Sequence, residues 1–431
     1  MRNLILILVI IPSFLFGQGW ERTYGGDDAD NGWSVQQTTD LGYIITGYTK
    51  SFGNGGSNVY LIKTDNNGDT IWTKTYGSVG DDYGHSVKQT TDNGYIITGN
   101  TWSTSNSSND VFLIKTDSNG DTIWTRVIDV EDYDKGYSVQ QTTDGGYIIT
   151  GFTKSFGNST DKVFLIKTEG NGNTIWTKTF NFHDSDIGHS VQQTTDGGYI
   201  ITGGTYSIDS DLTLIFLIKT DSNGDTLWTK IYGGDNNDYG YSVQQTMDGG
   251  YIITGYTASF GNGMEDVYLI KTDVNGDTLW TKTFGDEYDN YGLSVQQTTD
   301  EGYIITGGTV PDESGLQNVY LIKTNSNGDA IWSKTFGGEE RDVGLSVQQT
   351  MDEGYIITGY NQSNDITNVY LIKTDKNGII TFTTEIPVPN PNRKLIKKVD
   401  ISGNEIHNPK TNQPYIEIYD DGTTQKKMIM K

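Results

Sequence analysis

Acidic side chains are the residues of this chain with the clearest potential for chemistry. The sequence holds 55 Asp and Glu against 30 Lys and Arg, for a formal net charge of −25. Hard cations such as Ca²⁺ bind clustered carboxylate oxygens, and acidic runs occur at Asp27, Asp28 and Asp30 and at Asp81 and Asp82. These five aspartates are candidate calcium ligands, and plain solvated charge is the alternative. Nucleic acid is not an expected partner, because phosphate binding needs a basic surface.

Two tryptophans form a second candidate site. Seven of the nine tryptophans recur at one fixed spacing, and Trp33 and Trp102 do not. An exposed indole ring stacks on the C–H face of a sugar while nearby polar groups bind its hydroxyls. The candidate ligand-binding residues are Trp33, Trp102, Asp27, Asp28, Asp30 and His85. The alternative is that Trp33 and His85 only pack, as Leu293 and Leu345 would at the same repeat position.

A catalytic set is not evident from the sequence. Cysteine is absent, which excludes a Cys nucleophile, thiolate metal sites and disulfides. Serines are too numerous for one to stand out as a nucleophile, and the arginines Arg22, Arg126 and Arg341 lie far apart. We therefore expect non-catalytic binding of a glycan, a surface polymer or a protein. An extracellular carbohydrate-active hydrolase or lyase is the alternative.

A sequence repeat must position these residues. The run Gly42-Tyr43-Ile44-Ile45-Thr46-Gly47 occurs seven times with a period of 52 residues. A fixed period of this size is typical of repeat architectures. The repeated tyrosines are Tyr43, Tyr95, Tyr147, Tyr199, Tyr251, Tyr303 and Tyr355.

Each repeat contains four short runs of strand-forming residues, which we call strands a to d. In the first copy they are Ser34–Thr38, Tyr43–Thr46, Val59–Thr64 and Thr70–Tyr76. The Asn-Gly pair before strand d suits a hairpin turn, and the repeat leaves no room for a crossover helix. The pattern predicts an all-β fold: a seven-bladed β-propeller of four-stranded blades, plus a small C-terminal β module. We expect a monomer.

The repeated tryptophan of strand d predicts a wedge between adjacent blades. These structural tryptophans are Trp20, Trp72, Trp124, Trp176, Trp228, Trp280 and Trp332. Their spacing from a glycine resembles the tryptophan-docking motif of quinoprotein propellers. It also resembles the Asp-box turn of sialidase propellers, with each gap one residue longer here. Such motifs are structural in those families, so the resemblance implies no chemistry.

The ring can close in two ways. Trp20–Gly26 is a strand d without strands a to c before it, in register with the repeat. We predict that it completes the seventh blade beside Val369–Thr374. The alternative is a local hairpin that ends at Phe382, which is the faster contact to form.

The two faces of the propeller should differ. The a–b and c–d turns hardly vary between repeats, whereas the b–c and d–a loops vary, and the d–a loops are acidic throughout. Function tends to lie on loops that a rigid scaffold holds, so the variable face is the candidate. A lysine also recurs in strand c, beginning with Lys63, and we expect it to pair with the aspartate of a nearby a–b turn. Strand a, with its Ser, Gln and Thr residues, should line the central channel.

The ends of the chain differ from the repeats. Residues 1–17 combine Arg2 with the apolar run Leu4–Phe16, which is too short to span a membrane, and predict a secretory signal peptide. The propeller is expected over 18–382, followed by a proline-rich linker at 383–392. Residues 393–431 predict a small β module: a strand and turn over Lys394–Ile406, then a final hairpin of Tyr415–Thr423 and the basic segment Lys426–Lys431.

The last segment resembles the C-terminal sorting domain of the type IX secretion system of Bacteroidetes. The similarity lies in Val399-Asp400-Ile401-Ser402-Gly403-Asn404-Glu405 and in the closing basic strand. Together with the repeats, the chain resembles a secreted Bacteroidetes β-propeller protein. The resemblance implies that type IX machinery exports the protein to the outer cell surface or the medium.

Overall fold

A computed structural model describes residues 19–103, 108–128, 133–154, 160–311, 313, 315–380, 394–400, 405–406, 414–419 and 424–428. The chain divides into two compact units between Ile380 and Thr381. The predicted signal peptide, the linker at 383–392 and Phe382 lie outside the described residues.

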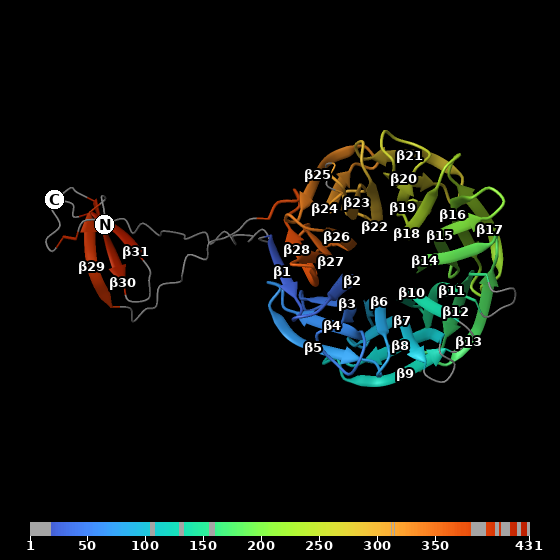
Figure 1. The fold of residues 1–431 in the computed structure, drawn as a ribbon, viewed down its shortest axis with the longest axis horizontal. Helices are drawn as coiled ribbons and strands as arrows, with labels where there is room; N and C mark the ends of the chain where they lie inside the picture. Colours follow the sequence, from blue (N-terminus) through green and yellow to red (C-terminus); the bar gives the residue numbers. More distant parts are fainter. Residues whose placement is uncertain are drawn as a thin grey trace, which may run out of the picture. The chain divides into compact units, whose positions relative to one another are not determined.

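The first unit is a seven-bladed β-propeller, as predicted, and each blade is a four-stranded antiparallel sheet (Figure 1). Blades one to three hold β2 (Asp30–Gln37), β3 (Tyr43–Thr49), β4 (Asn58–Thr64) and β5 (Thr70–Tyr76); β6 (Asp82–Gln89), β7 (Tyr95–Ser103), β8 (Ser108–Thr116) and β9 (Thr122–Ile128); and β10 (Asp134–Gln141), β11 (Tyr147–Thr153), β12 (Lys162–Thr168) and β13 (Thr174–Phe180). Blades four to six hold β14 (Ser185–Gln193), β15 (Tyr199–Ser207), β16 (Leu212–Thr220) and β17 (Thr226–Tyr232); β18 (Asp238–Gln245), β19 (Tyr251–Thr257), β20 (Asp266–Thr272) and β21 (Thr278–Phe284); and β22 (Asn290–Gln297), β23 (Tyr303–Thr309), β24 (Asn318–Thr324) and β25 (Ala330–Phe336). Blade seven holds β26 (Asp342–Gln349), β27 (Tyr355–Ser363), β28 (Ile366–Thr374) and β1 (Trp20–Tyr24).

The core lies between the blades. All seven residues of β4 are buried, whereas β5 alternates between exposed and half-buried positions at the rim. Ile44 and Leu61 of blade one pack with Tyr95 and Ile97 of blade two, and an equivalent cluster joins each neighbouring pair of blades. Because neighbouring blades cover both faces of strands b and c, these strands are continuous apolar runs and do not alternate.

The N-terminal strand closes the ring. β1 pairs antiparallel with β28, from Trp20 opposite Lys373 to Tyr24 opposite Val369. This confirms the predicted closure of blade seven by Trp20–Gly26. The first and last described strands of the propeller therefore share one sheet.

Each repeated tryptophan lies between two blades. Its ring packs edge-on against the strand-b tyrosine of the next blade, with ring centroids 5.8–6.0 Å apart in all seven pairs. The tip of the indole also covers the glycine of the next blade's Asn-Gly turn: a Cβ on Gly172 would lie 2.7 Å from Trp124. This glycine is therefore required by its backbone conformation (φ +83°) and by the packing of the indole.

A pair of glycine substitutions separates these two requirements. Gly172→Ala and Gly145→Ala place alanine at φ values of +83° and +84°, but a Cβ on Gly145 has nothing within 4 Å. We expect Gly145→Ala to cost about 1 kcal/mol for the left-handed conformation. Gly172→Ala should cost about 1–3 kcal/mol more, because Trp124 must move. Urea unfolding of the two variants measures the difference, and equal losses would contradict the wedge.

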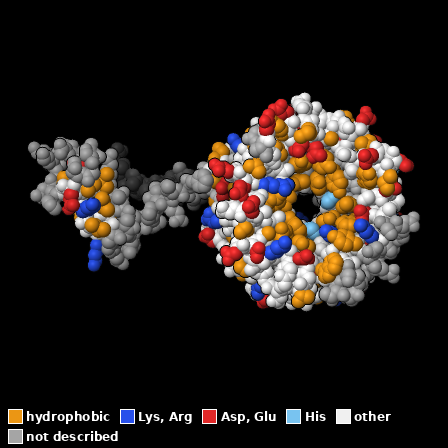
Figure 2. Space-filling model, viewed as in Figure 1, with side chains coloured by type: hydrophobic (Ala, Val, Ile, Leu, Met, Phe, Trp, Pro, Cys, Tyr) orange, Lys and Arg blue, Asp and Glu red, His pale blue; other side chains and the backbone are white. Residues whose placement is uncertain are grey.

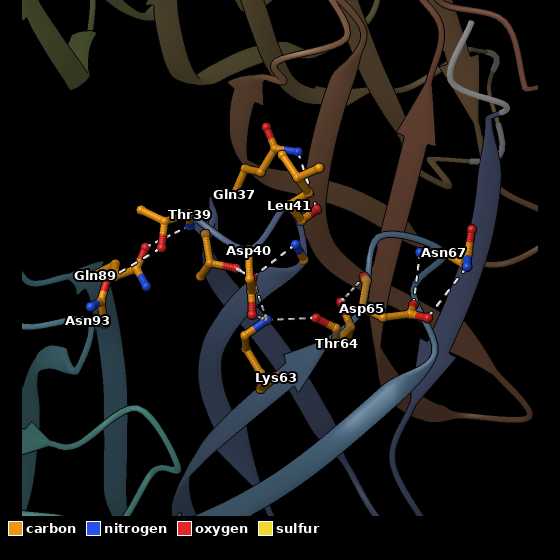
Figure 3. A network of polar contacts seen from close by, with 12 residues as sticks. Gln37, Thr39, Asp40, Leu41, Lys63, Thr64, Asp65, Asn67, Gln89 and Asn93 are labelled. Carbon is orange, nitrogen blue, oxygen red and sulfur yellow. Dashed lines mark hydrogen bonds and ion pairs between the residues drawn. The ribbon is translucent and has the colours of Figure 1, made fainter. Parts of the chain in front are cut away.

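The recurring lysines of strand c are buried and paired, as predicted. The distance from each Nζ to the carboxylate of the a–b turn is 2.8–3.0 Å. Figure 3 shows Lys63 between Asp40 and the carbonyl oxygen of Thr64. Burial raises the pKa of Asp92, but hydrogen bonds from Lys115 and Thr90 outweigh it and hold that pKa at about 2. The seven lysines therefore stabilise turns and are not free to bind ligands.

The second unit is a three-stranded antiparallel sheet in the order β29, β30, β31. Its strands are β29 (Leu395–Asp400), β30 (Pro414–Tyr419) and β31 (Thr424–Met428). β30 and β31 pair as the predicted final hairpin. Within the described parts of the chain, no helix is long and apolar enough to cross a membrane.

Candidate functional site

A pocket of about 270 Å³ opens where blades one, two and three meet. Trp33, His85 and Trp102, which the sequence singled out as ligand-binding residues, all line it, and so does Asp81. The lining residues are Trp33, Asp81, Tyr83, His85, Asn100, Trp102, Asn109, Tyr133 and Lys135. They come from β2, β6, β7, β8 and β10 and from the loops that precede β6 and β10.

A β-bulge in strand a aims Trp33 and His85. The pairing register shifts between Gly32 and Ser34 in blade one and between Gly84 and Ser86 in blade two. Such a bulge takes the residue between out of the ladder and redirects its side chain. All seven blades have this shift. The Gly-x-Ser spacing within a strand was the sequence signal for these bulges, since an isolated strand glycine is typical of a bulge.

The bulge residues of five blades form an aromatic collar, made of Trp33, His85, Tyr137, His189 and Tyr241. Successive ring centroids lie 4.4 to 5.1 Å apart. Each bulge residue directly precedes a serine of strand a, and four of these five serines, Ser86, Ser138, Ser190 and Ser242, line the central channel. Figure 2 shows hydrophobic and histidine side chains around the central opening. The collar therefore lines part of one mouth of the channel, over five of the seven blades, and Trp33 and His85 belong to both the collar and the pocket.

A chain of hydrogen bonds holds the floor of the pocket. Asn100 Nδ2 donates to Asn109 Oδ1 at 2.7 Å, which leaves Asn100 Oδ1 to accept from His85 Nε2 at 2.9 Å. Burial lowers the pKa of His85 to about 3, so the ring is neutral at physiological pH. The ring of Trp33 lies flat on His85, with the planes 1° apart and the centroids 4.4 Å apart.

Blade two has space for a pocket because Asn100, which lines it, has a small side chain. Asn100 occupies the repeat position that holds Tyr48, Phe152, Tyr256 or Tyr360 in four other blades. A bulky ring there would fill the volume above Asn109. Sequence reasoning missed Asn100 and Asn109, although the departure of Asn100 from the repeat was a visible signal.

Trp102 forms the outer wall and is 36% exposed. Its backbone N–H donates to the carbonyl oxygen of Asp81 at 3.0 Å. A Cβ on Gly80 would lie 2.8 Å from the Trp102 side chain, so the glycine makes room for the indole. Lys135 and Tyr133 also line the pocket, and the ammonium group of Lys135 lies 5.2 Å from the ring centre of Tyr133.

The remaining predicted aspartates do not line this pocket. Asp30 and Asp82 are fully buried and accept hydrogen bonds from backbone N–H groups: Gly26 N to Asp30 Oδ2 at 2.8 Å and Ser78 N to Asp82 Oδ2 at 2.6 Å. Burial raises the pKa of Asp82. These two carboxylates therefore shape the d–a loops.

Asp27 and Asp28 are exposed in the d–a loop before β2. Within the described ranges, no three His, Cys, Asp or Glu side chains are grouped so that they could hold a metal ion. Calcium binding by the five acidic candidates stays a prediction.

Comparisons with known proteins support the fold and go no further. No protein-family model matches the chain. An uncharacterized WD repeat-containing protein, L264, of Acanthamoeba polyphaga mimivirus is 22% identical, over 60% of this chain and 27% of that protein. The chain thus spans about a quarter of that relative's length.

Two solved structures align with most of this chain at low sequence identity. A crystal structure of puromycin hydrolase matches with a TM-score of 0.53 at 10% identity and covers 94% of this chain and 59% of that chain. Chaetomium thermophilum Sqt1, bound to the N-terminus of the ribosomal protein L10, matches with a TM-score of 0.48 at 9% identity, over 94% of this chain and 98% of that chain. Such likeness concerns the propeller fold alone, and function has to be argued from the site.

Proposed function

We propose that this propeller is a non-catalytic binding scaffold that takes a sugar unit of a glycan or surface polymer in the blade-two pocket. The observation that carries the proposal is the meeting of Trp33 and Trp102, from adjacent blades, in one pocket with Asn100 and Asn109. Indole faces suit the C–H surface of a sugar ring, and carboxamide and carboxylate groups suit its hydroxyls.

The pocket is preorganised for binding. The ring of Trp33 stacks on His85, and His85 is hydrogen-bonded to Asn100. Asn100 is in turn hydrogen-bonded to Asn109. Side chains that are already ordered lose little entropy when a ligand binds. Asp81 is also ordered, because its Oδ1 accepts from the backbone N–H of Ser57 at 2.7 Å.

The hydrolase alternative has less support from this pocket. Glycoside hydrolysis uses a pair of carboxyl groups that flank the scissile bond. Asp81 is the single acidic side chain among the described residues that line the pocket.

We further propose that binding takes place outside the cell. The signal-peptide pattern of residues 1–17 and the likeness of the tail to a type IX sorting domain support export. The three-stranded sheet of β29 to β31 is compatible with a compact sorting module. Intact-mass measurement of protein from the culture medium tests this: a start near Gln18 is expected, and a retained Met1 would count against it.

The binding proposal is tested with two substitutions that the repeat itself tolerates. Trp33→Leu introduces the residue that blades six and seven have as Leu293 and Leu345, and Trp102→Ala introduces that of blade five, Ala258. We expect each variant to lose about 10-fold or more in affinity for glycans that the wild type binds on an array, since stacked aromatic anchors dominate binding energy. Melting temperatures should stay close to that of the wild type.

The matched control is Trp124→Ala, which removes an indole from the inter-blade position and leaves the pocket lining intact. It should lower the melting temperature and leave glycan affinity unchanged at a temperature where the variant is folded. No glycan binding by the wild type, or equal binding by Trp33→Leu and Trp102→Ala, would refute the proposal.

A further inference from the structure

The central channel carries a feature that the binding pocket does not use. A cavity of about 230 Å³ on the axis is lined by serine, valine and glutamine side chains of strand a and by Lys88. Lys88 occupies the position that is glutamine in the other six blades. No other charged side chain among the described residues lines this cavity.

The serines of strand a use their oxygens to join the blades. Each serine Oγ accepts a hydrogen bond from the backbone N–H of the valine in the next blade, at 3.2–3.4 Å. The series closes the ring, because Ser346 of blade seven accepts from Val35 of blade one. A hydroxyl that accepts in this way still has its own hydrogen to donate.

The first glutamines of strand a do the same with their carboxamide oxygens. In six blades the Oε1 atom accepts from the backbone N–H of the second glutamine in the next blade, at 2.6–2.7 Å. Within the described chain, their amide nitrogens make no hydrogen bond to protein, so their N–H hydrogens remain to be used. The channel wall therefore presents the hydroxyl hydrogens of the serines and the amide hydrogens of the glutamines as hydrogen-bond donors. The oxygens of the same side chains already accept hydrogen bonds from the backbone.

Lys88 breaks the glutamine series in blade two. An ammonium group has three donors and no acceptor, so it cannot accept from Gln141 as a glutamine would. Among the described residues, Lys88 forms no hydrogen bond or ion pair, and burial lowers its pKa. A partly buried cation without a partner is unfavourable unless a counter-ion joins it.

We propose that the channel binds one small oxyanion, such as phosphate, sulfate or a carboxylate, between Lys88 and the ring of serine and glutamine donors. Lys88 supplies the positive charge, and the hydroxyl and amide hydrogens complete the coordination of the oxygens. The site is separate from the glycan pocket, because Lys88 is absent from the pocket lining.

The test uses the full-length protein and inorganic phosphate, sulfate and acetate as probes. Calorimetric titration should give one site per chain, and at ten times the dissociation constant the melting temperature should rise by about 2–4 °C. Lys88→Gln restores the glutamine of the other six blades and should abolish both responses. In anion-free buffer the variant should be at least as stable as the wild type, because Gln141 regains an acceptor.

Lys50→Gln is the control for net charge, since Lys50 is exposed and lies outside the channel. It should keep the wild-type response to all three anions. An anion response that is the same in Lys88→Gln as in the wild type, or no saturable binding to the wild type, would overturn the proposal. A response to phosphate and sulfate without acetate would restrict the site to tetrahedral oxyanions.

Discussion

Removal of the closing strand β1 should lower the melting temperature of the propeller by about 10 °C or more. β1 packs Trp20 and Tyr24 against the core cluster that joins blades seven and one. The hydroxyl of Tyr24 also donates to the carbonyl oxygen of Gly68 at 2.6 Å. Full burial of two large side chains would stabilise by about 3–6 kcal/mol; Trp20 and Tyr24 are partly buried and contribute less than this, and the ladder with β28 adds to it.

The deletion of residues 20–24 also leaves the edge of β28 unpaired, which favours association between chains. The junction of blades seven and one then depends on the contacts of strand a, such as the bond from Gln37 N to Gln348 Oε1. Thermal unfolding and limited proteolysis measure the effect. Deletion of residues 394–431, in the separate second unit, is the control and should leave the propeller transition unchanged. An unchanged transition without β1 would favour closure by the local hairpin that ends at Phe382.

Acidification from pH 7 to 5 should destabilise the propeller through the two histidines of the aromatic collar. Burial lowers the pKa of His85 to about 3 and that of His189 to about 4, from the ordinary value of 6.5. Below pH 6.5 the unfolded chain takes up protons that the folded chain does not. The free energy of unfolding therefore decreases as the pH is lowered. The loss continues until the folded-state pKa values are reached.

The slope is about 1.4 kcal/mol per pH unit for each histidine, or about 4 kcal/mol at most for both between pH 6.5 and pH 5. His189→Tyr and the double variant with His85→Tyr introduce the residue of blades three and five, Tyr137 and Tyr241. Urea unfolding at several pH values measures how the free energy of unfolding depends on pH. The single variant should lose the contribution of His189 to this dependence, and the double variant should lose the contributions of both histidines. The exposed His183 provides the control substitution, His183→Gln. A double variant with the wild-type pH dependence would show that other groups cause it.

The aspartates of the a–b turns do not contribute to the change in stability between pH 7 and pH 5. Hydrogen bonds from lysine, threonine and the backbone outweigh burial and hold the pKa values of Asp92, Asp144 and Asp196 at about 2. Their contribution is fully present above their ordinary pKa of 3.8 and is lost only as the pH falls toward 2.

The sequence by itself determined the architecture, because the architecture follows from local and periodic features. The 52-residue period, the four runs per repeat and the turn residues predict the blades, and the register of Trp20 with Trp72 predicts the closing strand. The pairing of Lys63 with Asp40 could also be predicted, since a lysine in strand c and an aspartate in the a–b turn recur together in every blade.

The tertiary structure alone decided which candidate residues meet. Trp33, His85 and Trp102 share a pocket because β-bulges in blades one and two redirect the first two rings, while Trp102 lies near the end of β7 in blade two. A repeat pattern does not encode such side-chain directions. Asp30 and Asp82 look like surface acids in the sequence, yet they turn inward because the d–a loops leave backbone N–H groups that need buried acceptors. The role of Lys88 likewise depends on the tertiary structure, which brings strand a of the blades around one axis. There this lysine has no ion-pair partner among the residues that the structure describes.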